Sequence, residues 1–401
     1  MSPGRPEVAV VVQRYGSEVT GGSESLARAV SERLAADFRV TVFTTCARDY
    51  VTWRNELPEG TERVGGVDVA RFPVVEEREL SSFNRLSAAI FAKEPSEEEE
   101  LLWLRRQGPH APNLVAALAR RKEDFAAVLF FTYLYAPTYW GLKAAPERAI
   151  LVPTAHDEPP LRLSIYRSVF AAPRAFAFCS VPESEIVKER FPLGGRPWEI
   201  AGIGVEPPAE PDVEGFRIRH DVRGPYALYA GRIDAGKGCG EMLDHYAEYR
   251  RACRGAAQLL LIGKLAMPAP RVPGVRYLGY VPEAEKMAAM AGATAVLCPS
   301  LYESLSIVLL EGLGLGTPGL VNGRSAVLRD HAVRSRGALY YLNAPEFVEA
   351  LDLLVREDGF RFALGENGIR YVKENYRWEV VMGRYRALIA AVGKQASTGS
   401  P

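Results

Sequence analysis

The sequence predicts an α/β protein made of two doubly wound domains, each built on a parallel sheet. Short apolar runs rich in β-branched residues alternate with amphipathic stretches along almost all of the 401 residues, and this alternation is typical of βαβ units with right-handed crossovers. The runs form two series separated by the segment 206–215, whose proline, glycine and acidic residues predict an interdomain linker. The composition, 48% hydrophobic and 24% charged, is ordinary for globular domains.

The expected strands can be placed one after another. The first series is 8–12, 39–44, 128–131, 149–153, 175–179 and 199–203, and the second is 227–231, 258–262, 275–280, 295–298, 319–322 and 339–342. Helical patterns lie between them, for example at 23–37 and 241–255. The acidic run 97–100 is interpreted as the solvated start of a helix, where carboxylates favour the positive end of the helix dipole. Ligands of open α/β sheets bind at the carboxyl ends of the strands, so a cleft is expected between the two domains.

The longest uncharged stretch, 125–142, allows two interpretations. Its length of about 18 residues suits a membrane helix. A buried parallel strand is favoured, because Pro137, threonines and tyrosines interrupt the stretch and its first half is β-rich. Five cysteines without C-x-x-C spacing indicate reduced thiols in a cytosolic protein rather than disulfides or a zinc site. No secretory signal opens the sequence.

The charge balance restricts the partners. With 49 basic and 49 acidic residues the formal net charge is zero, whereas a nucleic-acid-binding protein needs a basic surplus to neutralise phosphates. A disordered chain is excluded as well, because it would contain fewer apolar residues and more net charge. A local positive patch for a small anion remains possible.

The first of three notable clusters is GRIDAGKG, residues 231–238, directly after the expected strand 227–231. Arg232 can bind two phosphate oxygens at once and Lys237 adds a point charge. The free N–H groups of the helix that follows can also bind an anion. The alternative is a surface turn with two solvated bases.

The second cluster is PSLYESLSIVLLEG, residues 299–312. Glu303 and Glu311 are eight residues apart, which on a helix brings both carboxylates to one side. Backbone N–H groups at 304–306 open the expected helix and could bind an anion. The alternative is that Glu303 caps the helix and Glu311 is an exposed charge.

The third cluster is VTGGSES, residues 19–25, after the first strand. Gly21 and Gly22 allow close approach of a ligand to the backbone, and Ser23 is expected to cap the next helix. His156 follows another strand with acids and two prolines beside it. A histidine at a strand's carboxyl end occupies an active-site position, and an ordinary loop histidine is the alternative.

Several familiar motifs are excluded. GLGTPG at 314–319 matches G-x-G-x-x-G, but here the order is helix, glycines, strand rather than strand, glycines, helix. We therefore interpret it as a helix end and tight turn, and an NAD-dependent oxidoreductase is not expected. The sequence has no P-loop and no G-x-S-x-G. It also has no D-x-D pair, so a carboxylate-held metal has no evident place.

Taken together, these clusters resemble the family 4 glycosyltransferases, which are retaining, nucleotide-sugar-dependent enzymes of the GT-B architecture. The resemblance extends over nearly the whole chain and rests on GR-x4-KG at 231–238, P-S-x2-E-S-L-S-x4-E at 299–311 and G-T-P at 316–318. The near-N-terminal glycine pair, the His-Asp at 156–157 and GALYYLNAPEFVEAL at 337–351 add to it. The glycines of 312–316 and the extended HDEPP segment depart from the family pattern.

The resemblance implies a role for each cluster. Arg232 and Lys237 hold the donor diphosphate, Glu303 contacts the donor sugar, Glu311 binds the ribose hydroxyls, and His156 meets the donor sugar and the acceptor. The implied catalytic residues are Arg232, Lys237, Glu303 and His156, and the implied donor-binding residues are Gly21, Gly22, Gly231, Ser304, Leu305, Ser306 and Glu311. No metal and no cofactor besides the nucleotide-sugar co-substrate is expected.

The resemblance also implies two Rossmann-like domains facing a central cleft: an acceptor-side domain at 1–205 and a donor-binding domain at 206–375, with a C-terminal helix at about 376–395 that crosses back to the first. The expected reaction is transfer of a hexosyl unit from a UDP- or GDP-sugar to a sugar, lipid-linked or small-molecule acceptor, in polysaccharide, glycolipid or glycoconjugate biosynthesis. A cytoplasmic location, with possible peripheral membrane contact, is expected. Alternatives are a GT-B epimerase or phosphorylase, or a non-catalytic sugar-binding protein.

Overall fold

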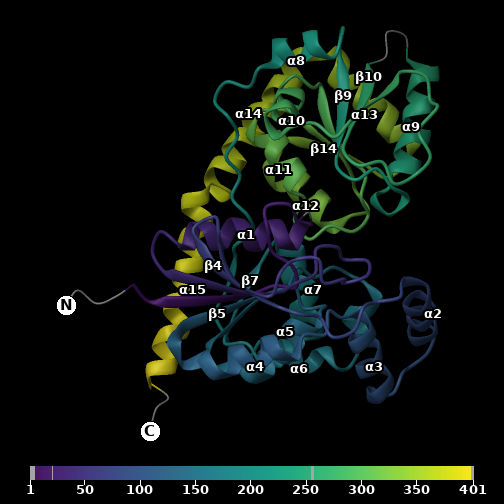
Figure 1. Cartoon of the computed structure of the whole chain (residues 1–401). Helices are drawn as coiled ribbons and strands as arrows, with labels where there is room; N and C mark the ends of the chain where they lie inside the picture. The colour runs from purple at the N-terminus through teal and green to yellow at the C-terminus, as the bar shows by residue number, and fades with distance from the viewer. Residues whose placement is uncertain (1–4, 20, 254–256, 399–401) are drawn as a thin grey trace. The chain divides into compact units, whose positions relative to one another are not determined.

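The computed structural model describes residues 5–19, 21–253 and 257–398; Thr20 of the third cluster lies outside them. The chain divides into two compact units. Unit 1 contains residues up to Ile203 together with those from Met382 onward, and unit 2 contains Gly204–Val381 (Figure 1). The last helix, α15 (Trp378–Thr398), begins in unit 2 and continues into unit 1.

Unit 1 is built on a sheet with strand order β3-β4-β2-β1-β5-β6-β7-β8. All neighbouring pairs are parallel except β3 and β4. The strands are β1 (Glu7–Val11), β2 (Arg39–Thr45), β3 (Gly60–Val64), β4 (Val67–Phe72), β5 (Phe125–Phe131), β6 (Ala149–Val152), β7 (Ala175–Phe178) and β8 (Trp198–Ile200). The helices are α1 (Gly22–Leu34), α2 (Leu80–Phe91), α3 (Glu97–Gln107), α4 (Pro112–Arg121), α5 (Ala136–Ala144), α6 (Tyr166–Ala171) and α7 (Val181–Arg190). Figure 1 shows α1 on one side of this sheet and α4 and α5 on the other.

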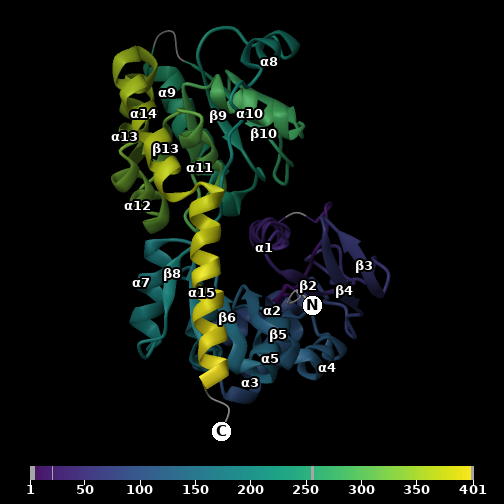
Figure 2. The same ribbon diagram turned by 90° about the vertical axis from the view of Figure 1, so that its left-hand side faces the viewer.

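Unit 2 has the strand order β11-β10-β9-β12-β13-β14, and every neighbouring pair is parallel. The strands are β9 (Tyr226–Ala230), β10 (Gln258–Ile262), β11 (Val275–Gly279), β12 (Ala295–Cys298), β13 (Gly319–Asn322) and β14 (Ala338–Tyr341). The helices are α8 (Val213–Arg219), α9 (Cys239–Ala252), α10 (Glu283–Ala291), α11 (Ile307–Gly314), α12 (Ala326–Ser335), α13 (Ala344–Arg356) and α14 (Asp358–Asn375). Figure 2 shows α12, α13 and α14 together at one side of this unit.

The hydrophobic pattern explains why each strand lies where it does. The central strands β1, β6 and β9 are buried along their whole length, and β5 is buried at every residue except Ala126, as expected for parallel strands covered on both faces. In unit 1 they pack against the apolar faces of α3 to α6, and in unit 2 the core joins β9, β10 and β12 to α9 and α13. The two doubly wound parallel sheets predicted from the sequence are confirmed.

The interpretation of 125–142 as a buried strand is also confirmed, because β5 covers its first half and α5 begins at Ala136. Among the described residues, no helix combines the length and the apolar character needed to cross a membrane. All five cysteines are free thiols, and only Cys253 is not buried. The G-x-G-x-x-G match likewise has the predicted order, since α11 ends at Gly314 and β13 begins at Gly319.

Some local predictions are wrong. Residues 213–215 of the expected linker belong to α8, where Asp212 caps the helix by accepting a hydrogen bond from the Gly215 N–H. The acids at 97–100 do begin a helix, α3, with a capping box between Ser96 and Glu99. Glu100, however, is not solvated: it is buried and accepts hydrogen bonds from the backbone and hydroxyl of Ser164.

The antiparallel hairpin β3–β4 was not predicted. Its turn is formed by Gly65 and Gly66, both with positive φ, and β4 alternates buried and half-buried residues. Two consecutive glycines are a turn signal, and only one of the two flanking strands, β4, has an alternating pattern.

Candidate active site

Two of the predicted motifs follow the two strands at the centre of unit 2. The sheet order reverses between β9 and β12, because the chain moves outward from β9 to β11 and then returns to the other side of β9. Residues 231–238 follow β9 and residues 299–306 follow β12. The carboxyl ends of strands beside such a reversal form the usual ligand site of an open α/β sheet.

The loop after β9 is organised by Asp234, a residue that the sequence reasoning did not select. Asp234 caps the short 3-10 turn η4 (Ala235–Lys237), with one carboxylate oxygen 2.8 Å from the Lys237 amide nitrogen. Its other oxygen accepts a hydrogen bond from Arg232 Nε. Partial burial opposes ionisation of Asp234, but these hydrogen bonds outweigh burial and lower the pKa of its carboxyl group. Asp234 therefore holds Arg232 and Lys237 in a defined loop.

An ion pair connects the loop after β9 to the loop after β12. Lys237 Nζ lies 2.8 Å from Glu303 Oε1, and both side chains are partly exposed. Gly238 permits this approach: it has a φ of 73°, and a Cβ there would collide with the carbonyl oxygen of Pro299. The structure thus brings two predicted site residues, Lys237 and Glu303, into direct contact.

The loop after β12 differs from the prediction in one respect. Helix α11 begins only at Ile307, so Glu303 lies in the preceding loop and does not cap the helix. The expectation that Glu303 and Glu311 share one side of a helix is therefore wrong. Ser306, the last residue before the helix, has a φ of 64°, a conformation that is uncommon for a residue other than glycine and that often occurs at functional sites.

Glu311 occupies α11 itself and pairs with a different lysine. Its Oε2 is 3.0 Å from Nζ of Lys286, a residue of α10. Burial raises the pKa of Glu311, although Lys286 acts in the opposite direction. Glu311 is therefore not the exposed charge that the alternative interpretation required. Glu311 and Lys286 form a second charged pair in unit 2.

In unit 1, the glycine pair lies at the start of α1. Gly21 is the N-terminal cap with a φ of 153°, Gly22 is the first helical residue, and no side chain caps the helix. The expectation that Ser23 is the cap is wrong, because its hydroxyl donates to Glu24 Oε2 at 2.8 Å. Glu24 is buried and paired with Arg14, so a buried ion pair lies at the start of α1.

His156 lies in the loop after β6, also in unit 1. Its Nε2 is 3.4 Å from Glu158 Oε2, and the hydroxyl of Tyr133 donates to Glu158 Oε1 at 2.7 Å. Burial raises the pKa of Glu158. Thr132 and Thr154, near the ends of β5 and β6, both have positive φ, an outlier conformation for β-branched residues.

A fully buried carboxyl group holds the same loop. Glu183, in the first turn of α7, accepts hydrogen bonds from the backbone N–H groups of Ala155, at 2.6 Å, and of Cys179. Burial raises the pKa of Glu183 to about 8. The sequence reasoning missed Glu158, Tyr133 and Glu183; only the proximity of Glu158 to His156 in HDEPP offered a signal.

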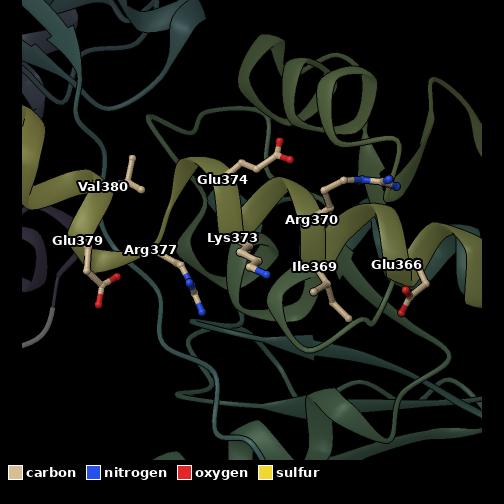
Figure 3. Close-up of a pocket in the computed structure, with 8 residues that line it drawn as sticks. All are labelled: Glu366, Ile369, Arg370, Lys373, Glu374, Arg377, Glu379 and Val380. Carbon is tan, nitrogen blue, oxygen red and sulfur yellow. The ribbon is translucent and has the colours of Figure 1, made fainter.

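One hollow of the described structure lies elsewhere in unit 2. It has a volume of about 610 Å³ and is lined by side chains of α14, of the start of α15 and of Arg377 between these two helices (Figure 3). None of the predicted site residues lines it. Hydrogen-bonded loops at the strand ends, rather than the volume of this hollow, define the candidate site.

Comparisons with known proteins identify the class of protein. Residues 224–357 match the family model "Glycosyl transferases group 1", which covers about a third of the chain and includes both motifs of unit 2. Phosphatidyl-myo-inositol mannosyltransferase from Mycobacterium leprae is 26% identical over 280 residues, 64% of this chain and 71% of that protein. Glycogen synthase from Thermus thermophilus is 30% identical over 180 residues, 43% of this chain and 40% of that protein, so the chain spans less than half of that relative.

Solved structures resemble the chain over nearly its whole length. Sucrose-phosphate synthase from Thermosynechococcus elongatus has a TM-score of 0.71 at 17% identity, covering 96% of this chain and 100% of that chain. Anabaena HepE, solved with UDP and glucose, has a TM-score of 0.69 at 12% identity with the same coverage. These structures show that the fold is GT-B. The matched domain and the named relatives show that the chain is a glycosyltransferase.

Proposed function

We propose that this glycosyltransferase transfers a hexosyl unit from a UDP- or GDP-sugar to an acceptor hydroxyl with retention of the anomeric configuration. The observation that carries the proposal is the charged cluster at the sheet reversal of unit 2, where Lys237 is paired with Glu303 and Arg232 lies in the same capped loop. One structural neighbour and one sequence relative give further support, since HepE was solved with UDP and the Mycobacterium leprae protein is named a mannosyltransferase.

The proposed reaction needs positive charge where the leaving group develops negative charge. The bond between the anomeric carbon and the diphosphate breaks, and the acceptor oxygen bonds to the same face of that carbon. The acceptor proton passes to the departing diphosphate. Arg232 and Lys237 are already held in place by Asp234 and Glu303, and such preorganised charges bind the departing diphosphate more strongly than the bound donor, which lowers the barrier.

The remaining residues receive binding roles in this proposal. Glu311 binds the ribose hydroxyls, the backbone of Gly231 and of 304–306 contacts the diphosphate and sugar, and Glu303 contacts the sugar. Gly21, Gly22 and His156 of unit 1 bind substrate groups. The acceptor class, a sugar, a lipid-linked sugar or a small molecule, is proposed to be selected by unit 1. No metal or further cofactor takes part.

A donor screen tests the proposal. The protein is incubated with UDP- and GDP-hexoses, and release of the nucleoside diphosphate is measured with and without candidate acceptors. Acceptor-dependent release from one nucleotide class is expected. Binding without turnover across the panel would instead support a sugar-binding protein, and conversion of the free nucleotide sugar to its epimer would support an epimerase.

The stereochemical part has a separate test. When the product is assigned by NMR, the anomeric proton coupling of the transferred sugar is expected to match that of the donor. An inverted product would reject retention while leaving glycosyl transfer intact.

A further inference from the structure

A buried histidine of α12 is bound to the loop that follows β12. His331 is completely buried, and both of its ring nitrogens have hydrogen-bond partners. Nε2 lies 2.8 Å from the carbonyl oxygen of Leu305, and Nδ1 lies 3.0 Å from the hydroxyl of Tyr371 in α14. Figure 2 shows α12 and α14 at the same side of unit 2. The imidazole therefore connects the helix layer to the candidate donor loop.

The partners determine the form of the imidazole. A carbonyl oxygen only accepts hydrogen bonds, so Nε2 carries the proton and Nδ1 accepts from Tyr371. Burial lowers the pKa of His331 to about 4, which keeps the ring neutral at pH 7. The ring also packs against Tyr371 and Tyr376.

The planar peptide bond after Leu305 also fixes the direction of the Ser306 N–H group. The carbonyl of Leu305 and the amide N–H of Ser306 belong to one planar trans peptide unit and point in opposite directions. Because His331 holds the Leu305 carbonyl toward the core, the Ser306 N–H is directed away from the imidazole. Ser306 precedes α11, whose first N–H groups have no partner within the helix.

A second side chain holds the other end of the loop. Asn322, buried at the end of β13, donates from Nδ2 to the carbonyl oxygen of Pro299 at 3.0 Å. The segment that contains Glu303 is therefore held near both of its ends by side chains from neighbouring elements. The strained φ of Ser306 is of the kind that persists only when surrounding contacts enforce it.

We propose that His331 is a positioning residue for the donor: through the Leu305 carbonyl it holds the 304–306 backbone in the conformation that binds the diphosphate. The inference rests on the proposed function and adds to it a residue that touches neither substrate nor reacting atoms. Such a contact tightens donor binding and does not raise the rate of the chemical step.

Three variants test the inference. His331→Leu removes the donor to Leu305, and His331→Gln restores an amide N–H at the position of Nε2. His245→Leu is the matched control, because His245 is a buried histidine of α9 whose ring packs on Tyr341 and Phe347 rather than on the donor loop. If His331→Leu does not fold, His331→Phe, which retains an aromatic ring, replaces it.

Binding of UDP and of GDP to each variant is measured by calorimetry, and donor KM and kcat are measured for the nucleotide that binds. His331→Leu is expected to raise the dissociation constant and the donor KM about tenfold with kcat within about threefold of wild type. His331→Gln is expected to stay within threefold of wild type in both constants, as is His245→Leu. Unchanged affinity in His331→Leu, with a loss of thermal stability similar to that of His245→Leu, would overturn the inference.

Hydrogen exchange gives a readout without any ligand. Amides of the peptide 299–312 are expected to exchange at least tenfold faster in His331→Leu than in wild type, and at the wild-type rate in His245→Leu. Equal exchange in all variants also overturns the inference. If wild type binds neither UDP nor GDP, the proposed donor class fails, and the exchange rates still decide whether His331 positions the loop.

Discussion

At the scale of single residues, charge arrangement dominates the candidate site. Lys237 and Glu303 belong to different loops and are joined at 2.8 Å, and Arg232 is held by Asp234 two residues away. Because the pairs are partly exposed, each contributes only ~0.2–1 kcal/mol to stability. Their value therefore lies in placing cations where a diphosphate would bind.

We expect Lys237→Ala to lower kcat/KM by about 10² to 10³, the usual effect of removing one electrostatic contact to a developing anion. Steady-state kinetics with the donor identified by the screen provide the measurement. Arg223→Ala is the matched control, because Arg223 is an exposed base of unit 2 that pairs with exposed Asp221, and its kcat/KM should equal wild type. Full activity in Lys237→Ala would remove this residue from the mechanism.

His331 leads to a prediction about pH and stability. Its pKa is about 4 in the folded protein against an ordinary 6.5, so between these values the unfolded chain binds a proton that the folded chain does not. Stability therefore falls as the pH drops from about 6.5 to 4, by up to about 3 kcal/mol from this group. Above pH 6.5 the group contributes no pH dependence.

Chemical unfolding of wild type and His331→Gln at pH 7 and pH 4.5 measures this difference. We expect the wild type to lose more stability on acidification than the variant, which has no imidazole to protonate. An identical loss in both would show that other groups cause the acid sensitivity.

At the scale of elements, glycines determine how closely helices approach one another. Helix α11 contains Gly312 and Gly314, and the turn after it contains Gly316. These glycines, which depart from the family pattern, allow close contacts here: a Cβ at Gly312 would lie 2.8 Å from Val296 Cγ2. A Cβ at Gly365 of α14 would collide with the carbonyl of Gly316, and a Cβ at Gly368 would lie 3.0 Å from the Leu313 carbonyl.

We expect Gly365→Ala to destabilise unit 2 by ~1–3 kcal/mol, because a methyl group inserted into a close-packed contact forces a backbone shift. Gly359→Ala in the same helix meets no atom within 4 Å and is expected to be neutral or to stabilise by up to ~1 kcal/mol. Denaturant unfolding of both variants measures the difference. Equal effects would mean that the contact between α14 and the turn at Gly316 is loose.

At the scale of the whole molecule, the chain builds two doubly wound units and returns from the second to the first through α15. In unit 1, α15 is bound by an ion pair between Arg386 and Asp37 at 2.7 Å and by a hydrogen bond from Arg384 to the Ile200 carbonyl at 2.7 Å. The helix predicted at about 376–395 exists and is slightly longer. Both of these contacts come from the first half of the helix.

In the proposed reaction, side chains alone neutralise the charge of the departing diphosphate. We therefore expect transfer in buffer containing EDTA to retain at least about 80% of the rate measured with added Mg²⁺ or Mn²⁺, since Arg232 and Lys237 remain charged under both conditions. The rate is measured after dialysis against the chelator. A rate that falls more than tenfold and recovers on adding a divalent cation would contradict the proposed metal independence.

Much of the fold could be predicted because it depends on local patterns. Continuous apolar strands, alternating helices and the glycine-rich segment 314–319 each signal their structure within a short window. The hairpin β3–β4 was missed because its outer strand β3 is exposed over nearly all of its length and so lacks the apolar run on which strand prediction relies.

The candidate site was also predictable only in part. The sequence by itself determined the doubly wound class and selected Arg232, Lys237, Glu303 and His156 in loops after strands and Glu311 in the motif's helix, because strand ends and motif spacing are local properties. Only the tertiary structure decided their partners: Asp234 for Arg232, Lys286 for Glu311, and His331 for the Leu305 carbonyl. Asp234 is only two residues from Arg232, but Lys286 and His331 are 25 and 26 residues from their partners. Those two contacts form only because separate elements converge in the folded unit.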